Sequence, residues 1–383
     1  MRTNAKTLPA KCILIAMMAM ISGCENQTIS NIISEGVPSS DAIKETLTIT
    51  VPPPSDGLEF ESNGDGTCTI TGIGTCGDTD LVIPTKSPDG DTVTQIAKYA
   101  FYDLEDIDSI TFSDYNYEID KYAFQYGEFT SLNVIGGAPI FKESAFSSCE
   151  DLGSITFANC TIQIGEYTFF SCGKDADLIF SNCTGILDKR AFQYSDLLNL
   201  TINDCELDIE ESVFSSCENL TSISIIDSTI DADEYSFFSC GDSAIVEMSN
   251  CSLVLDDRAF QYSSLGTLSV TGAALEIGKS TFSNCEDLSN VMIDSNSVLL
   301  GEYAFFGCDD LTNVSICADA GSDDTIEIDD RAFQYCEKLK SVIIGKGAID
   351  IGEYVFDGGS DDLTLSIAGK KYTADSIKNG FPQ

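Results

Sequence analysis

Apolar residues along this chain recur in a short pattern whose most regular position is a phenylalanine. That phenylalanine occurs twelve times, at intervals close to 23 residues. The positions are Phe101, Phe124, Phe146, Phe169, Phe192, Phe214, Phe237, Phe260, Phe282, Phe305, Phe333 and Phe356. A fixed period of this length indicates stacked structural repeats, each formed by one small unit of chain.

The apolar positions within one repeat predict short strands separated by turns. Leu311 is followed by Val314 and Ile316, an alternation typical of a strand with one buried face. A second apolar pair, Ile326 and Ile328, precedes the next phenylalanine. Clusters of Asp, Gly and Ser between these segments indicate turns. Each repeat is therefore predicted to form one coil.

A coil of this size cannot bury its own phenylalanine and aliphatic side chains, so neighbouring coils must cover them. Equivalent strands are expected to pair in parallel, about 4.8 Å apart. The phenylalanines should then form one internal ladder. We predict a repeat solenoid of about twelve coils, capped at both ends, with short parallel strands and short helical turns.

The repeat resembles a known family, the BspA-like leucine-rich repeat proteins of bacterial and protist surfaces. The shared pattern is Ile-Gly-x-x-Ala-Phe-x-x-Cys-x-x-Leu-x-x-Ile-x-Ile, and the resemblance covers about residues 81–370. The matching residues include Ile351, Gly352, Phe356, Ala332, Phe333, Cys336, Leu339, Val342 and Ile344. The cysteine is replaced at Gly127, Ser195, Ser263 and Gly359. The resemblance implies a right-handed leucine-rich-repeat coil and a role in adhesion or protein recognition without catalysis.

The repeats are themselves grouped in threes. Ala-Phe-Gln-Tyr occurs around Phe124, Phe192 and Phe260, which are 68 residues apart, and again around Phe333. Phe-Phe begins at Phe169, Phe237 and Phe305 with the same spacing of 68 residues between each pair. The array therefore looks like a block of three coils that was copied. Copying adds surface rather than new chemistry.

The first two segments of the chain precede the repeats. Residues 1–23 carry basic residues and then an apolar run, the pattern of a signal peptide that is too short to span a membrane. They end in Ile21-Ser22-Gly23-Cys24, which resembles the bacterial lipoprotein box and implies lipidation of Cys24 at the cell envelope. An ordinary secretory leader is the alternative. Residues 24–57 are polar and then proline-rich, as in a flexible tether.

The ends of the repeat array depart from the pattern. Residues 58–97 are predicted to form an N-terminal β cap and the first coil, followed by repeats over 98–367. Residues 368–383 are predicted to be a C-terminal cap, with a short helix that ends at Gly380. Caps are expected because a solenoid end exposes apolar side chains and an unpaired strand. An independent ligand module, such as a glycan-binding one, is the alternative for the N-terminal segment.

Composition narrows the classes of function. The chain has no His, which excludes Ser-His-Asp, Cys-His and His-ligated zinc sites. Its net charge of −42 argues against nucleic acid and against anionic membranes, so we expect membrane contact only through a lipid anchor. Paired acids are interpreted as turn residues. We predict no enzyme activity, cofactor or metal, and a monomeric protein.

The cysteines recur with the repeat, which places most of them in internal columns as buried thiols. One column follows the phenylalanine by three residues, and another follows the first strand of the coil. An exported protein is free to form disulfides, and Cys68 and Cys76 are the candidate pair.

The candidate partner contacts lie beside the phenylalanine ladder. They are Tyr126, Tyr194, Tyr262, Tyr335, Arg190, Arg258 and Arg331. Tyr and Arg are enriched among residues that dominate binding energy. The outward strand positions, from Thr111 through Asn133 to Ile343, form a stripe that is mostly small and uncharged. We predict a protein or matrix ligand; a glycan ligand and a passive stalk, in which Tyr and Arg only shield the coil edge, are the alternatives.

Overall fold

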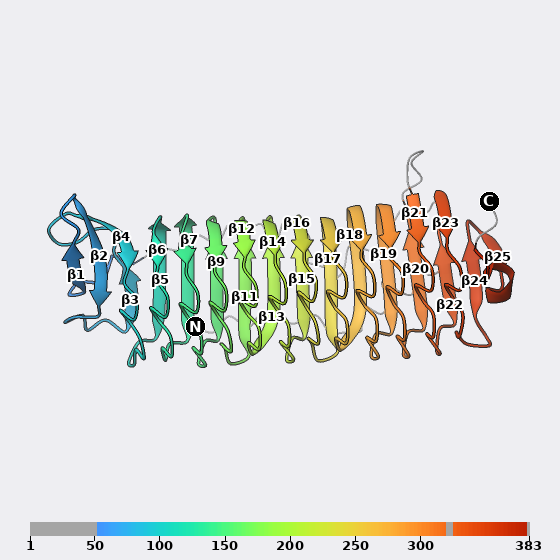
Figure 1. Ribbon diagram of the computed structural model, residues 1–383, viewed down its shortest axis with the longest axis horizontal. Coiled ribbons are helices and arrows are strands. Elements are labelled where there is room, and N and C mark those ends of the chain that lie inside the picture. Colours follow the sequence, from blue (N-terminus) through green and yellow to red (C-terminus); the bar gives the residue numbers. More distant parts are fainter. Residues whose placement is uncertain (1–51, 319–324, 381–383) are drawn as a thin grey trace, which may run out of the picture. The chain divides into compact units, whose positions relative to one another are not determined.

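Two columns of parallel strands run side by side through a row of stacked coils (Figure 1). The computed structural model describes residues 52–318 and 325–380. In each coil the chain passes from a turn that carries the phenylalanine to a first-column strand, then to a second-column strand, and then to the next turn. The predicted solenoid is confirmed.

The first column pairs in parallel from end to end. It contains β3 (Asp80–Ile83), β5 (Ser109–Tyr115), β7 (Ser131–Gly137), β9 (Ser154–Ala158), β11 (Ala176–Ser181), β13 (Leu197–Asn203), β15 (Ser222–Ile226), β20 (Asn313–Cys317), β22 (Ser341–Ile344) and β24 (Thr364–Ile367). The second column contains β2 (Thr67–Gly72), β4 (Thr92–Ile96), β6 (Glu118–Ile119), β8 (Ile140–Phe141), β10 (Thr161–Ile164), β12 (Thr184–Leu187), β14 (Glu206–Ile209), β16 (Thr229–Ala232), β21 (Thr325–Ile328) and β23 (Ala348–Ile351).

Three long strands belong to both columns because they continue around the corner between them. These are β17 (Ala244–Leu255), β18 (Leu265–Ile277) and β19 (Asn290–Leu300). The sequence analysis expected a break at this corner in every coil. The hydrogen-bonded ladder is continuous here, with register shifts between Met248 and Ser252 where β17 turns.

Register is fixed by the alternation of buried and partly exposed residues. Val314 pairs with Val342 and Ile316 with Ile344, so each aliphatic side chain lies on the equivalent side chain of the next coil. A slip of one residue would move every one of these side chains to the solvent face. The apolar alternation therefore determines both the strand and its position in the stack.

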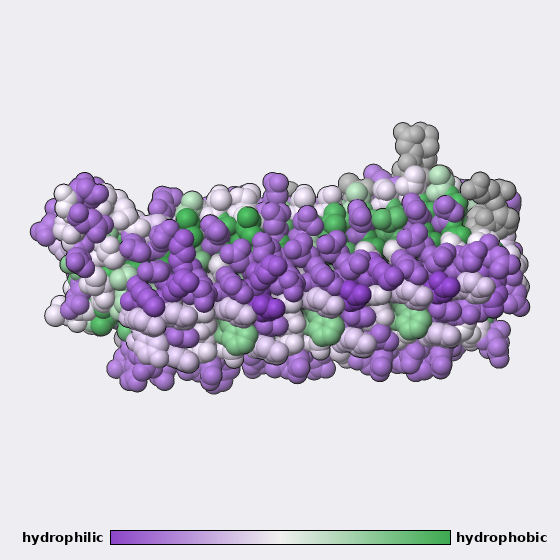
Figure 2. Space-filling view, viewed as in Figure 1, coloured by the Kyte–Doolittle hydropathy of each residue, from purple (hydrophilic) through white to green (hydrophobic). Residues whose placement is uncertain are grey.

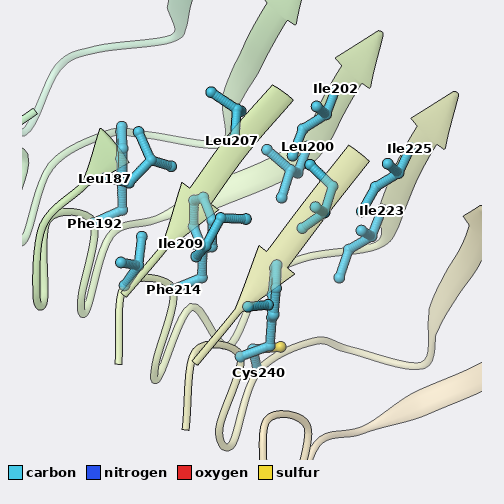
Figure 3. Close-up of a cluster of buried hydrophobic side chains, with 14 of the residues drawn as sticks. Leu187, Phe192, Leu200, Ile202, Leu207, Ile209, Phe214, Ile223, Ile225 and Cys240 are labelled. Carbon is cyan, nitrogen blue, oxygen red and sulfur yellow. The ribbon is translucent and has the colours of Figure 1, made fainter. Parts of the chain in front are cut away.

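The twelve phenylalanines form the predicted internal ladder. Successive rings are stacked, with centroids 4.5 Å apart at Phe237–Phe260 and 5.7 Å apart at Phe333–Phe356, the two extremes. Figure 3 shows Phe192 and Phe214 on the same side of the core, facing aliphatic side chains of the strands. The ladder continues across the 28-residue interval, since Phe305 and Phe333 stack at 4.9 Å. The inserted residues 319–324 lie outside the described residues.

A column of cysteine and serine side chains supports this ladder. The Cys217 thiol donates to the Phe192 carbonyl at 3.2 Å, one coil earlier, and Cys149, Cys172, Cys285, Cys308 and Cys336 do the same to their own ladder residue. Where serine replaces cysteine the bond is kept, because Ser195 donates to the Phe169 carbonyl at 2.6 Å. The prediction of buried thiols is confirmed at these positions.

The chain around each phenylalanine forms tight turns, and the predicted short helical turns are not found there. The residues two before and two after each phenylalanine have positive φ, as Arg190 (φ 60°) and Tyr194 (φ 60°) do around Phe192. Alternate amides then donate to the next coil: Phe192 donates to the Val213 carbonyl and Tyr194 to the Ser215 carbonyl. A helix would use these amides internally, so it could not hold the coils together in this way.

Antiparallel strands lie at both ends of the stack. β1 (Glu59–Ser62) pairs with β2, and β25 (Lys370–Tyr372) pairs with β24. The short helix η2 (Ala374–Ile377) begins after Thr373 and lies within the segment where a helix was predicted. No helix among the described residues is long and apolar enough to cross a bilayer. The assignment of the end segments as caps stays a prediction.

Candidate functional site

Left-handed turn residues place large side chains on the outside of the stack. In every third coil, the residue two after the phenylalanine is a tyrosine, at Tyr126, Tyr194, Tyr262 and Tyr335. These four side chains are 46%, 57%, 56% and 50% exposed, which makes them among the most exposed large side chains of the described residues. A non-glycine residue in this conformation costs roughly 1–2 kcal/mol. The turn that builds the core therefore also presents the tyrosines to solvent.

Each of these tyrosines completes a cluster of three aromatic rings. Tyr167 packs edge-to-face on Phe170 at 5.4 Å, and Phe170 packs edge-to-face on Tyr194 of the next coil at 5.5 Å. The same arrangement is formed by Tyr235, Phe238 and Tyr262, by Tyr303, Phe306 and Tyr335, and by Tyr99, Tyr102 and Tyr126. We call these four groups the aromatic clusters. Three coils separate one cluster from the next, or about 14 Å.

A cation lies against the first tyrosine of each aromatic cluster. The Arg190 guanidinium lies 5.9 Å from the Tyr167 ring centroid, and its Nη1 donates to the Tyr167 hydroxyl at 3.1 Å. Arg258 lies 5.8 Å from the Tyr235 centroid, and Arg331 lies 5.7 Å from that of Tyr303. In the first cluster, Lys98 takes this place, 4.8 Å from the centroid of Tyr99. Such contacts contribute about 0.5–1 kcal/mol at exposed sites.

A glutamate of the preceding coil neutralises each arginine. Arg258 Nη1 lies 2.6 Å from Glu234 Oε1, and this bond raises the pKa of the Arg258 guanidinium. The equivalent pairs, Arg190 with Glu166 and Arg331 with Glu302, have longer separations of 3.7 and 3.6 Å. The three arginines therefore tie neighbouring coils together, and the exposed tyrosines are the parts of the clusters that a partner would meet first.

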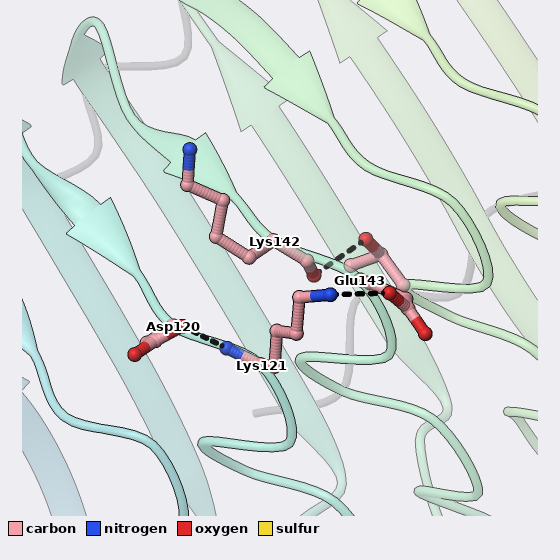
Figure 4. Close-up of polar contacts among 5 residues, drawn as sticks. Asp120, Lys121, Lys142 and Glu143 are labelled. Carbon is pink, nitrogen blue, oxygen red and sulfur yellow. Dashed lines mark hydrogen bonds and ion pairs between the residues drawn. The ribbon is translucent and has the colours of Figure 1, made fainter.

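A second row of ion pairs runs beside the clusters. Lys121 Nζ lies 2.6 Å from Glu143 Oε2, each residue standing three positions before its phenylalanine, and the Lys121 amide donates to the Asp120 carboxylate (Figure 4). Lys189 pairs with Glu211 at 3.1 Å and Lys279 with Glu302 at 2.7 Å at the same position. These side chains are partly exposed, so each pair contributes about 0–1 kcal/mol. They use most of the cations of this acidic surface to join coils.

The surface between the clusters is hydrophilic. Figure 2 shows separate hydrophobic patches at regular intervals along one face, with hydrophilic residues between them. Beside Tyr194, a shallow depression of about 370 Å³ is lined by the acidic residues Glu150, Asp151 and Asp196 and by Lys174. Among the described residues, no group of three His, Cys, Asp or Glu side chains is placed to hold a metal ion.

The outward strand positions form the continuous stripe that was expected. Thr111 pairs with Asn133, Asn133 with Thr156, and the alignment continues through to Ser315 and Ile343. The stripe therefore exists as one surface, and its side chains are mostly small.

The other predicted site residues have different outcomes. Cys24 lies outside the described residues, so its lipidation stays a prediction. Cys68 and Cys76 are separate thiols in the structure: Cys68 is buried with its Sγ 3.7 Å from the Asp91 carbonyl, whereas Cys76 is half-buried. Their pairing also stays a prediction.

Sequence reasoning found the outer tyrosines and arginines but missed the residues they contact. Tyr167, Phe170 and Glu166 complete the cluster around Tyr194, and their counterparts recur in the next two blocks. The signal was present as Glu-Tyr-x-Phe-Phe, which begins at residues 166, 234 and 302. It was interpreted as a mark of repetition and not as part of a surface.

Comparison with known families identifies the repeat. A family model described as BspA type Leucine rich repeat region (6 copies) matches residues 85–199, 139–266, 185–312 and 254–371. Together these matches span residues 85–371, which is more than half of the chain.

Several solved structures are similar to the chain at low sequence identity. A leucine-rich repeat protein from Bacteroides ovatus is 19% identical and covers 83% of this chain and 94% of that chain, with a TM-score of 0.36. A leucine rich cell surface protein from Faecalibacterium prausnitzii is 18% identical, covers 86% and 98%, and has a TM-score of 0.31. The pneumococcal vaccine antigen PcpA is 16% identical, covers 83% and 87%, and has a TM-score of 0.34. No curated protein matches the chain.

Proposed function

The chain belongs to the BspA-type leucine-rich repeat family, and on this premise we propose that it is an exported, lipid-anchored surface protein that recognises a protein partner without catalysis. The partner is a host or matrix protein or a protein of another cell. The aromatic clusters form the contact surface. The leader that ends at Cys24 supports export and anchoring.

One observation carries this proposal: the same exposed aromatic cluster occurs four times along one row of coils. Tyrosine offers a large contact area with few rotatable bonds and a hydroxyl that can bond to a partner, which is why it dominates many binding surfaces. Tyr194 is already held by its contact with Phe170, so little side-chain entropy would be lost on binding. Four equivalent clusters would also let a large partner bind at several points.

The acidic surface supports the choice of partner class. A net charge of −42 repels polyanions, so nucleic acid and sulfated polymers are poor candidates. A partner with basic residues around an apolar contact would be attracted at long range, and the attraction would weaken as salt is added.

The test is a binding screen of the full mature chain against immobilised extracellular-matrix proteins. We expect saturable binding to at least one of them, and at least a tenfold loss of affinity when Tyr194→Ala and Tyr262→Ala are combined. The matched control is Ile186→Ala, which removes another exposed apolar side chain from the second strand column and should leave binding unchanged. Tyr194→Phe combined with Tyr262→Phe separates the contribution of the rings from that of the hydroxyls.

Two results would contradict the proposal. Saturable binding that the double alanine variant does not weaken would move the contact away from the clusters. No binding to any matrix or cell-surface protein, together with an altered envelope when the protein is deleted, would favour a passive stalk. The continuous stripe of small, mostly uncharged strand residues is the observation that favours this second candidate.

A further inference from the structure

A second column of cysteines lies at the corner between the two strand columns, apart from the thiols that support the ladder. Cys160, Cys183 and Cys205 occupy the same position in three successive coils, since each directly precedes one of the in-register strands β10, β12 and β14. The Sγ atoms of Cys160 and Cys183 are 3.4 Å apart. The amide of Cys183 donates to Sγ of Cys205 at 3.3 Å. Three thiols are therefore in contact along the stack.

These thiols differ from the ladder column in what they bond to. Each ladder thiol with a printed carbonyl bond, such as Cys149, donates to a phenylalanine carbonyl of the preceding coil. Cys160, by contrast, faces another thiol. Hydrogen bonds from Cys160 and Cys205 lower the pKa of the Cys183 thiol, whereas the pKa values of Cys160 and Cys205 are raised. Cys183 is thus the thiol of this group that most readily loses its proton.

The backbone at this corner permits a covalent link between coils. In-register parallel neighbours lie about 4.8 Å apart, which is within the range of Cα separations of about 4.4–6.8 Å that disulfides span. Cysteines within a flat ladder project in parallel and fit the disulfide torsion poorly. Cys160, Cys183 and Cys205 instead follow the left-handed residues Asn159, Asn182 and Asp204, with φ of 56°, 52° and 53°. They lie where the chain changes direction, outside the regular strands.

We propose that this corner is a redox modification site, at which Cys183 forms a disulfide with Cys160 and, when Cys160 is absent, with Cys205. The bond would staple two neighbouring coils. Further along the column the position is occupied by Ser228, so Cys251 has no thiol neighbour in the adjacent preceding coil. The column therefore contains one group that can be oxidised and one isolated thiol.

The chemistry is a two-step thiol–disulfide exchange. The Cys183 thiolate attacks a low-molecular-weight disulfide such as oxidised glutathione, forms a mixed disulfide and releases one glutathione thiolate. Cys160 then loses its proton, and its sulfur displaces the second glutathione from Cys183. One oxidised glutathione and two protein thiols thus give one protein disulfide and two reduced glutathione molecules.

Burial determines when this exchange takes place. Cys160, Cys183 and Cys205 are only 4%, 0% and 5% exposed. The oxidant therefore reaches Cys183 before the coils close, or while the corner is locally open. The closed stack would then protect the disulfide from reductants in the same way.

The test is to refold the full chain with oxidised glutathione or with a reductant, block the remaining thiols, and map tryptic peptides by mass spectrometry. Cleavage at Lys142, Lys174 and Lys189 leaves Cys183 as the one cysteine of the peptide 175–189, whereas Cys160 lies in the peptide 143–174. We expect most of the oxidised protein to contain these two peptides joined, with the loss of two hydrogens. The reduced sample should contain them separately.

Single variants assign the bond. Cys160→Ser should transfer the link from the peptide 143–174 to the peptide 191–258, which contains Cys205, whereas Cys205→Ser and Cys251→Ser should leave the original link in place. A peptide 175–189 that remains unlinked in the oxidised wild type would overturn the proposal. A link that survives Cys160→Ser unchanged would assign it to Cys149 or Cys172 and would also overturn it. The experiment uses purified protein, so its outcome does not depend on the proposed export or on any partner.

Discussion

The inside and the outside of this stack repeat with different periods. Inside, a phenylalanine stacks on the next one in every coil, from Phe101 to Phe356. Outside, the aromatic clusters recur in every third coil, 68 residues apart for Tyr167, Tyr235 and Tyr303. A core position touches its equivalents in both neighbouring coils, so it must repeat in each of them. An outer position is free of this requirement, and it is there that the sequence can encode a partner.

The largest expected effect tests the inner side of this comparison. Phe192→Ala removes one ring from the middle of the ladder and should destabilise the protein by about 3–5 kcal/mol, because it leaves a cavity between two stacked rings. Tyr194→Ala, two residues away but exposed, should change stability by only about 0.5 kcal/mol. Urea unfolding followed by circular dichroism measures both.

Hydrogen exchange of single amides adds the spatial part of this test, because a repeat stack can open locally. The Phe192 variant should expose amides of coils 169 to 214 first. Equal losses of stability for the two variants would remove the distinction between a constrained inside and a free outside.

A smaller effect is expected in the column that supports the ladder. Ser195 Oγ donates to the Phe169 carbonyl at 2.6 Å and accepts from the Cys172 amide at 3.3 Å, so Ser195→Ala should leave two buried polar groups unpaired and cost about 1–3 kcal/mol. Ser195→Cys should restore most of this loss, since Cys217 makes the equivalent bond in another coil. The melting temperatures of the two variants give the comparison. A cysteine variant as unstable as the alanine variant would show that packing, and not the hydrogen bond, determines this position.

The smallest effect concerns acids on the outer surface. Burial, with the nearby carboxylates of Asp233 and Asp231, raises the pKa of Asp256. The folded protein therefore binds this proton more tightly than the unfolded chain, and stability falls as pH rises from the ordinary carboxyl pKa through the raised value. Asp256→Asn should thus be slightly more stable than the wild type at neutral pH, and the difference should vanish as the pH falls below both pKa values.

Asp357 provides the control of opposite sign. Its hydrogen bond from Lys378, at 2.9 Å, lowers the pKa of the Asp357 carboxyl. The stability from this pair is present above the ordinary carboxyl pKa and is lost as the pH falls through the lowered value. Asp357→Asn should therefore be less stable than the wild type at neutral pH. Thermal unfolding of both variants across the acidic range checks the two signs; the same sign for both would mean that overall charge, and not local contact, controls the response.

The spacing of apolar residues was enough to predict the interior of this protein. Phe192 and Phe214 could be assigned to one ladder because nothing else in a short coil can cover such a ring. The equivalence of Ser195 to a cysteine also followed from its position in the repeat, although its bond to the Phe169 carbonyl did not.

The turns and the outer surface were harder to predict. Arg190 and Tyr194 adopt a left-handed conformation that such residues usually avoid, so propensity favoured a helical turn over the one observed. The contact between Tyr194 and Phe170 depends on the direction in which each turn projects its side chains. Neither residue is apolar at a regular strand position, so periodicity alone could not bring them together.

The 68-residue block has a consequence for how this protein can change over generations. Units that join through identical seams can be gained or lost by unequal recombination without disturbing their neighbours, and the tolerated interval between Phe305 and Phe333 shows how little the seam depends on linker length. Each such event would alter the reach of the molecule by about 14 Å and add or delete one whole aromatic cluster. Related strains would then differ in discrete steps of length and valency, while the chemistry of each step stayed the same.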